Sequence, residues 1–209
     1  MVRALVCLMK TRFLAALLLC LSSLAAAQAR PEGGGRELEV WTGGGHSVSG
    51  GTSNTGVFNL GVRYGWILTR PHGPGFLKGR FEYAVDAVPM FLVFQPRNTA
   101  YGVALNPLNL KWNFATRGTV VPYLELDGGT LFTSEEVPSG TSKVNFTSGT
   151  AFGMHFLQHS YNWSLEVRYM HISNAGLTSP NPGINTLQVR LGIGKFLPGS
   201  QGRQKGPRP

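Results

Sequence analysis

The stretch of this sequence best equipped for chemistry is "HISNAGLTSPNPGIN", residues 171–185. His171 and Ser173 lie two positions apart at the end of a run that alternates apolar and polar residues, and a loop rich in Asn, Gly and Pro follows them. In an extended strand, side chains at i and i+2 share one face, with their roots roughly 6.5–7 Å apart. A serine nucleophile needs a neighbouring base, and an imidazole is the usual one. The spacing therefore allows a serine nucleophile and its general base.

A second interpretation of His171 and Ser173 gives them no chemical role. On this interpretation they are polar residues at the end of a membrane strand, solvated at the level of the lipid headgroups. The next strand-like run places Asn185 on the same face as Leu187 and Val189. If the two runs are antiparallel neighbours, all three polar residues converge near one rim of a sheet. The residues by themselves leave both interpretations open.

The elements that must position these residues have a period of two. In residues 57–69, for example, Phe58 and Leu60 lie on one face and Asn59 and Arg63 on the other. Such alternation predicts β-strands, and no long segment has the period of a helix. Turns rich in Gly, Pro, Asn and Ser separate eight such segments: 37–42, 57–69, 76–88, 108–114, 120–129, 144–156, 164–173 and 184–196.

The content of the two faces indicates which one is buried. One face of each strand carries large aromatic and aliphatic residues, as the lipid-facing wall of a membrane barrel does. The polar faces balance cations against anions, which suits a closed interior where buried ions need partners. These charges are Arg63, Lys78, Arg80, Lys111, Arg168 and Arg190 against Glu39, Glu82, Asp86, Glu125, Asp127 and Glu166. The sequence therefore predicts an all-β protein: an eight-stranded antiparallel outer-membrane β-barrel with a filled polar lumen. A soluble β-barrel is the alternative.

The two ends of the chain differ in composition from this barrel. A basic start, an apolar core and small residues near Ala27 predict a cleaved signal peptide at 1–27, hence export. Both cysteines, Cys7 and Cys20, fall within it, so disulfides and cysteine-based zinc sites are not expected in the mature chain. The barrel is then expected over 28–196 and a disordered basic tail over 197–209.

The charge of the mature chain bears on its partners. Without residues 1–27 the chain has 16 basic and 10 acidic residues, a net charge of +6. An anionic lipid surface is a better match for a basic exported protein than nucleic acid is. We expect a membrane-embedded protein with no nucleic-acid partner.

The motif "HISNAGL…PNPGIN" at the end of an outer-membrane strand resembles the signature of the lipid A 3-O-deacylase family, often described among acyloxyacyl hydrolases. The eight-strand plan and "PYLELDGG" at 122–129 support the resemblance. It implies an outer-membrane barrel that hydrolyses the ester-linked acyl chain at the 3-position of lipid A, or lipopolysaccharide, without a cofactor. On the same resemblance Ser173 is the nucleophile and His171 the general base. Gly176, through its backbone N–H, and Asn181 fall at the oxyanion hole, and Asn174 supports the turn.

Asn185 departs from the family pattern, because the best-known members carry glutamate at this position. A neutral amide can accept a hydrogen bond from the histidine ring, yet it supplies no charge to stabilise the imidazolium. Three outcomes follow: a working Ser-His-Asn arrangement, an attenuated enzyme, or a barrel without activity. Glu166 is no substitute, since alternation places it in the lumen.

Parts of the sequence are also compatible with functions other than ester hydrolysis. His155 and His159 are four apart near a strand end, but no third ligand accompanies them locally, so no metal site is expected. A non-catalytic structural or adhesive outer-membrane barrel is the main alternative to the hydrolase. A soluble barrel that binds an apolar ligand is the third possibility.

Overall fold

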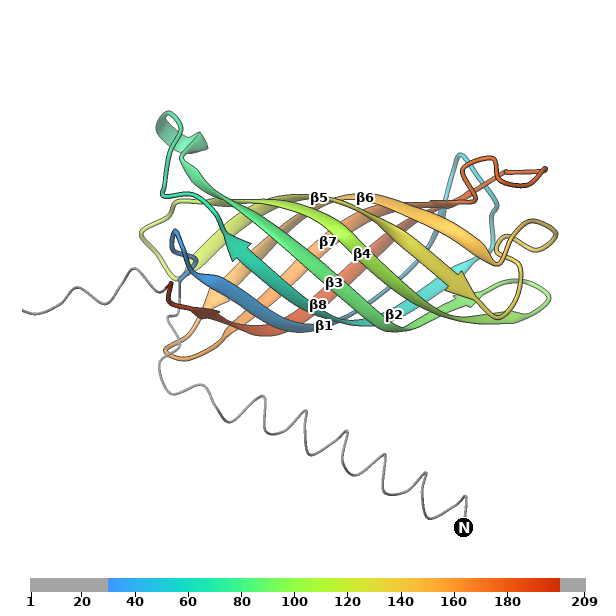
Figure 1. Cartoon of the computed structure of the whole chain (residues 1–209), viewed down its shortest axis with the longest axis horizontal. Helices are drawn as coiled ribbons and strands as arrows, with labels where there is room; N and C mark the ends of the chain where they lie inside the picture. The colour runs from blue at the N-terminus through green and yellow to red at the C-terminus, as the bar shows by residue number, and fades with distance from the viewer. Residues whose placement is uncertain (1–29, 200–209) are drawn as a thin grey trace, which may run out of the picture.

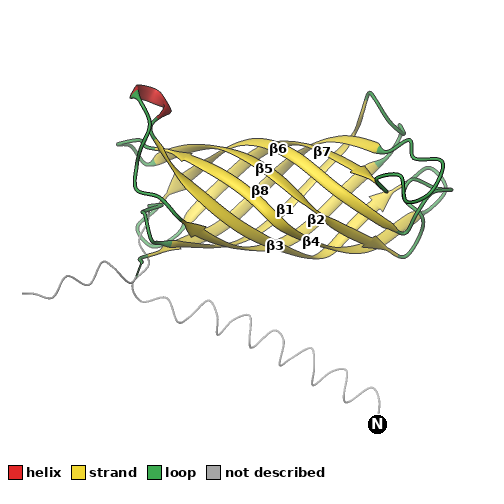
Figure 2. Ribbon diagram, turned by 45° about the horizontal axis from the view of Figure 1, so that its top comes forward, coloured by secondary structure: helices red, strands yellow, loops and turns green. Residues whose placement is uncertain are grey.

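The computed structural model describes residues 30–199, and these form one closed antiparallel barrel (Figure 1). Each strand pairs with the next, and β1 pairs with β8 to close the sheet. The strands are β1 (Arg36–Val48), β2 (Gly56–Ile67), β3 (Gly79–Phe94), β4 (Thr99–Phe114), β5 (Val120–Thr133), β6 (Val144–Leu157), β7 (Asn162–Ser173) and β8 (Ile184–Leu197). The predicted fold class is confirmed. A single-turn helix, η1 (Gly75–Leu77), stands beside the barrel end (Figure 2).

Several predicted strand bounds were wrong, and bulges explain two of them. β4 begins at Thr99 instead of 108, and β3 continues past residue 88 to Phe94. Between these strands the register shifts at Ala84/Asp86 and again at Val88/Phe91. Each bulge inserts a residue and reverses the inside-outside phase, which hides the strand from a search for strict alternation. In addition, residues 76–78 precede β3, because η1 occupies 75–77.

The outer wall is apolar along its whole circumference. Outward residues of successive strands are exposed, for example Leu126 on β5, Val167 on β7 and Leu191 on β8, each between 47% and 58%. Aromatic residues lie near both rims: Trp66 and Trp163 toward the termini, Tyr101, Phe132 and Phe146 toward the opposite end. An apolar band between two aromatic girdles is the surface that a bilayer covers. Among residues 30–199 no helix is long and apolar enough to cross a membrane.

The lumen is filled by a buried ionic network. Arg63 bonds Asp86 at 2.7 Å and Glu125 at 2.6 Å, and Arg168 bonds the same Glu125 at 2.6 Å. Lys111 lies 2.6 Å from Glu37. The links of Arg63 with Glu125 and of Lys111 with Glu37 cross between strands that are not neighbours, so side chains, and not an open pore, occupy the interior.

The expected one-for-one balance of lumenal charges was wrong. Lys78 is exposed before β3, Arg80 is only half-buried near the barrel end, and Glu37 adds a carboxylate to the interior. Within the described residues, four buried Lys and Arg residues face seven buried carboxylates. These are Arg63, Lys111, Arg168 and Arg190 against Glu37, Glu39, Glu82, Asp86, Glu125, Asp127 and Glu166.

The loops divide into two sets. Loops 49–55, 95–98, 134–143 and 174–183 lie at the end remote from the described termini (Figure 1). The connections 68–78, 115–119 and 158–161 lie at the end that carries the termini. The candidate catalytic residues predicted from the sequence lie at the end remote from the termini.

Candidate functional site

His171 and Asn185 meet on the outer face at the remote rim. They are directly paired across β7 and β8, and His171 Nδ1 lies 2.7 Å from Asn185 Oδ1. The amide oxygen is an acceptor, so the ring nitrogen that faces it carries the proton. In the neutral ring this leaves Nε2 as the free base. His171 is half-buried, whereas Asn185 is only 6% exposed.

Ser173 ends β7 on the same outward face as His171. It is half-buried and pairs with Phe146 of β6, one of the aromatic residues at this rim. Within residues 30–199 its hydroxyl makes no hydrogen bond, to His171 or to any other group. The i, i+2 relation keeps the two side chains on one face, within reach of each other by rotation. Apo sites often have such loose contacts, which tighten on substrate binding.

The turn after Ser173 is fixed by Asn174. Ala175 and Gly176 both have positive φ, 52° and 82°, and Leu177 N–H donates to Asn174 O at 3.0 Å, which forms a type I′ turn. The buried Asn174 side chain donates to Thr178 Oγ1 at 2.7 Å and accepts from Gly176 N–H at 2.8 Å. The chain thereby reverses directly above Ser173.

The two residues predicted for the oxyanion hole differ in whether their donor groups are already hydrogen-bonded. Gly176 N–H already donates to Asn174 Oδ1, so it is not free to bind an oxyanion in this conformation. Asn181 lies in the same loop and uses its Oδ1 to accept from Asn174 N–H at 3.2 Å. Its amide Nδ2 has no acceptor among residues 30–199. Of the two predicted donors, Asn181 Nδ2 is therefore the one without an acceptor among the described residues.

Backbone glycines bring the loops against His171 and Asn185. A Cβ on Gly183 would lie 2.7 Å from His171 Cε1, and one on Gly50 would lie 2.8 Å from Asn185 Nδ2. Both residues have positive φ, 64° and 99°. Loop 49–55 also contacts loop 174–183 directly, because Thr52 N–H donates to Gly183 O at 2.9 Å. Only glycine allows this approach at these positions.

Two neighbours of the site have no signal in the sequence. Ser148 of β6 is paired directly with His171 and is exposed on the outer face. The Ser49 carbonyl of loop 49–55 accepts from Asn185 Nδ2 at 3.3 Å. The first contact follows from the register between β6 and β7, and the second from the closure of the barrel, which brings the end of β1 beside β8.

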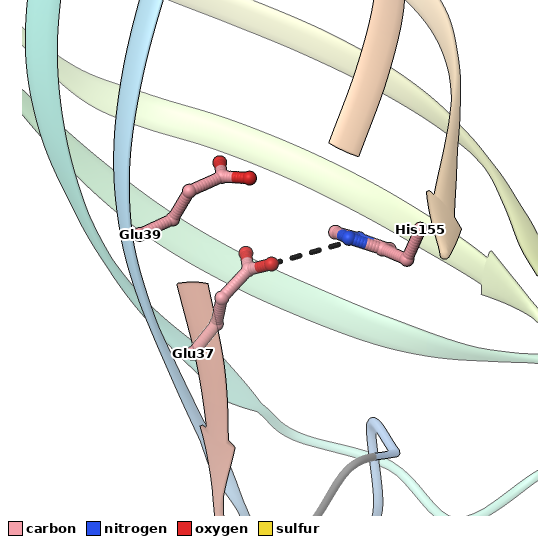
Figure 3. A group of neighbouring side chains, drawn as sticks. All are labelled: Glu37, Glu39 and His155. Atoms are coloured by element: carbon pink, nitrogen blue, oxygen red, sulfur yellow. Dashed lines mark ion pairs between the residues drawn. The ribbon is translucent and has the colours of Figure 1, made fainter. Parts of the chain in front are cut away.

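A separate group with metal-ligating side chains lies in the lumen (Figure 3). Ligand atoms of Glu37, Glu39 and His155 lie within 4.8 Å of one another, and His155 Nε2 is 3.5 Å from Glu37 Oε1. The ammonium of Lys111, 2.6 Å from the second Glu37 oxygen, already supplies a positive charge there. The group is therefore part of the ionic network. His159, by contrast, lies exposed in connection 158–161, apart from His155.

Comparison with known proteins places this chain in a family. The model of the lipid A 3-O-deacylase (PagL) family matches residues 58–194. The chain belongs to this family. Residues 58–194 include His171, Ser173, Asn181 and Asn185. The resemblance seen in the sequence is thus confirmed.

A solved structure agrees on the fold of this deacylase-family chain. "Crystal structure of the outer membrane enzyme PagL" matches with 22% identity and a TM-score of 0.58, covering 74% of this chain and 97% of that one. Neisserial surface protein A matches with 14% identity and a TM-score of 0.48, covering 78% and 96%. The sequence has no significant match among curated proteins. The chain is accordingly a deacylase-type outer-membrane barrel.

Proposed function

We propose that this protein is an outer-membrane serine ester hydrolase that removes the 3-O-linked acyl chain from lipid A. The observation that carries the proposal is the 2.7 Å contact of His171 with Asn185, on the outer face beside Ser173, in a chain of the deacylase family. With Nδ1 engaged by Asn185, Nε2 is the ring nitrogen that remains to take the Ser173 proton. Ser173 is the nucleophile, His171 the base, and Asn185 the group that orients the base.

The reaction follows from these roles. His171 Nε2 takes the Ser173 proton while Oγ attacks the ester carbonyl, and a tetrahedral oxyanion forms. Collapse breaks the bond to the sugar oxygen, which receives the proton from His171. Water, deprotonated by the same nitrogen, then attacks the acyl-serine and releases the fatty acid. The Asn181 amide is our first choice of oxyanion donor, and such donors are worth about 3 kcal/mol each.

The position of the site supports a lipid substrate. His171 and Ser173 face outward from the wall, next to the aromatic rim residue Phe146. Groups on that surface contact molecules that lie within the membrane leaflet, where the ester bonds of a glycolipid lie near the headgroup level.

The proposal is tested by the masses of lipid A from an outer-membrane host that expresses the protein. The wild type is expected to remove one 3-hydroxyacyl group, and Ser173→Ala to leave lipid A intact while the barrel folds. Ser148→Ala is the matched control, since this serine flanks His171 from β6. It should deacylate as the wild type does.

Each contrary result has its own meaning. Identical lipid A for wild type and Ser173→Ala, with both folded in the outer membrane, would contradict catalysis and favour a structural or adhesive barrel. Loss of activity in Ser148→Ala alone would transfer the nucleophile role to Ser148. Loss of an acyl group from another position would contradict the 3-O assignment and leave the hydrolase.

A further inference from the structure

We infer that the main-chain carbonyl of Ser49 makes Asn185 the working partner of His171. It does so by holding the side-chain amide in the one orientation that accepts from the imidazole. Loop 49–55 is then a positioning element of the site, although it lies far from the motif in sequence. The inference rests on the proposed function and deepens it.

The first step concerns the two ends of the Asn185 amide. A carboxamide has one acceptor oxygen and one donor nitrogen, whereas a carboxylate has two acceptors. Asn185 Oδ1 lies 2.7 Å from His171 Nδ1, and Asn185 Nδ2 lies 3.3 Å from Ser49 O. Rotation of the amide by half a turn would direct its oxygen at the Ser49 carbonyl and its NH₂ at His171. That arrangement opposes the two oxygens of Asn185 and Ser49 whatever the tautomer of His171, and it lets the amide meet the ring only if His171 gives up its Nδ1 proton for the Nε2–H tautomer.

The second step concerns how firmly the carbonyl is held. Thr52 N–H donates to Gly183 O at 2.9 Å, and Ser47 and Thr55 bond each other through backbone and hydroxyl at 2.8 and 3.1 Å. Gly50 allows the backbone to approach Asn185, which is only 6% exposed. The Ser49 carbonyl is thus an acceptor held in place beside the Asn185 side chain.

The consequence is a match between the loop and a neutral residue. An aspartate at 185 would still accept from His171, but its second oxygen would face the Ser49 carbonyl with no proton between them. The surroundings of position 185 therefore match an amide better than a carboxylate. Asn185 is then a functional residue and not the loss of one. If Asn185 is an attenuated replacement of a carboxylate, a carboxylate at this position should raise the rate. If the site requires an amide, a carboxylate should lower it.

The experiment combines two substitutions in the full-length protein, folded in the outer membrane or in detergent micelles. In the native loop, Asn185→Asp is expected to lower kcat/KM for 3-hydroxyacyl release about tenfold, the cost of one unsatisfied buried hydrogen-bonding group. In a Gly50→Ala background, where the new Cβ displaces the loop, the same substitution is expected to raise kcat/KM. A gain from Asn185→Asp in the native loop would overturn the inference.

Gly140→Ala is the matched control for Gly50→Ala. Gly140 also has a positive φ, 83° against 99°, and lies in a loop at the same rim, but a Cβ there meets nothing within 4 Å. In the Gly140→Ala background Asn185→Asp should lower the rate as it does in the native loop. A rise in that background would assign the effect to general loop strain and overturn the role of Ser49.

A measurement that needs no turnover separates this inference from the proposed function. ¹⁵N-histidine NMR, with His171→Gln to assign the signal, should show His171 protonated at Nδ1 in the wild type and Gly140→Ala. Gly50→Ala should show a mixture of tautomers, because the amide is released. An inactive wild type with the Nδ1–H tautomer would refute the hydrolase and support the positioning. A wild type protonated at Nε2 would refute the positioning whatever the activity.

Discussion

His155 and His171 belong to adjacent strands, yet the barrel wall separates them. His155 points into the lumen with no exposed surface, stacks near Tyr123 at 4.6 Å between ring centroids, and makes no hydrogen bond within the described residues. His171 points outward, is half-buried, and holds a 2.7 Å contact with Asn185. The surroundings of the two rings differ in charge as well. Full ionic groups surround His155, whereas uncharged amides, hydroxyls and backbone groups surround His171.

This difference indicates that the lumenal face and the outer face of the barrel wall have different roles. In the lumen, charges are desolvated and must be paired, so the network stabilises one closed arrangement. At the rim, neutral groups orient a base without a permanent charge on the lipid-facing surface, where charges are costly. A carboxylate on the rim carries that cost, and an amide does not.

The largest expected effect comes from exchanging one histidine at a time. His171→Gln should lower deacylation about 10⁴-fold, because the base is lost while the fold stays. His155→Gln should keep the rate within a few-fold, since it lies on the other side of the wall. Rates on lipid A in micelles measure both. Equal losses in the two variants would contradict the division between the faces.

The next effect is on stability and belongs to the lumen. Glu125 bonds both Arg63 and Arg168, so Glu125→Gln leaves two buried guanidinium groups undercompensated. We expect a loss of about 3–5 kcal/mol in the free energy of unfolding. Urea titration followed by the heat-modifiable shift in gel mobility measures it. Glu135→Gln in the exposed loop 134–143 is the control and should change little.

The smallest effect sharpens the role of loop geometry at the rim. Gly183→Ala combines a positive φ with a Cβ 2.7 Å from His171 Cε1, so the ring must shift. We expect about a tenfold fall in kcat, as displaced catalytic groups commonly show, with the barrel still folded. Gly34→Ala, with φ 83° and open space around its Cβ, controls for backbone strain. Equal rates for both variants would show that the contact with His171 is without consequence.

Much of this barrel was predictable from local pattern. The alternation in β2 and β5 to β8 placed each side chain on its correct face, because no extra residue is inserted into these strands and the shifts against β3 and β4 add theirs to β3 and β4. The pattern failed in β3 and β4, where bulges shift the phase. It also missed the end of β1, since "GGGH" presents glycines that mark neither face.

The sequence by itself determined the strand period, the outward direction of His171 and Ser173, and the motif that marks the family. These depend on neighbours within a few residues. Only the tertiary structure decided that Ser148 and Asn185 pair directly with His171, and only the closure of the barrel brought the Ser49 carbonyl to Asn185. The physical reason is register: hydrogen bonds between strands fix which distant residues stand opposite each other, and local pattern does not encode that choice.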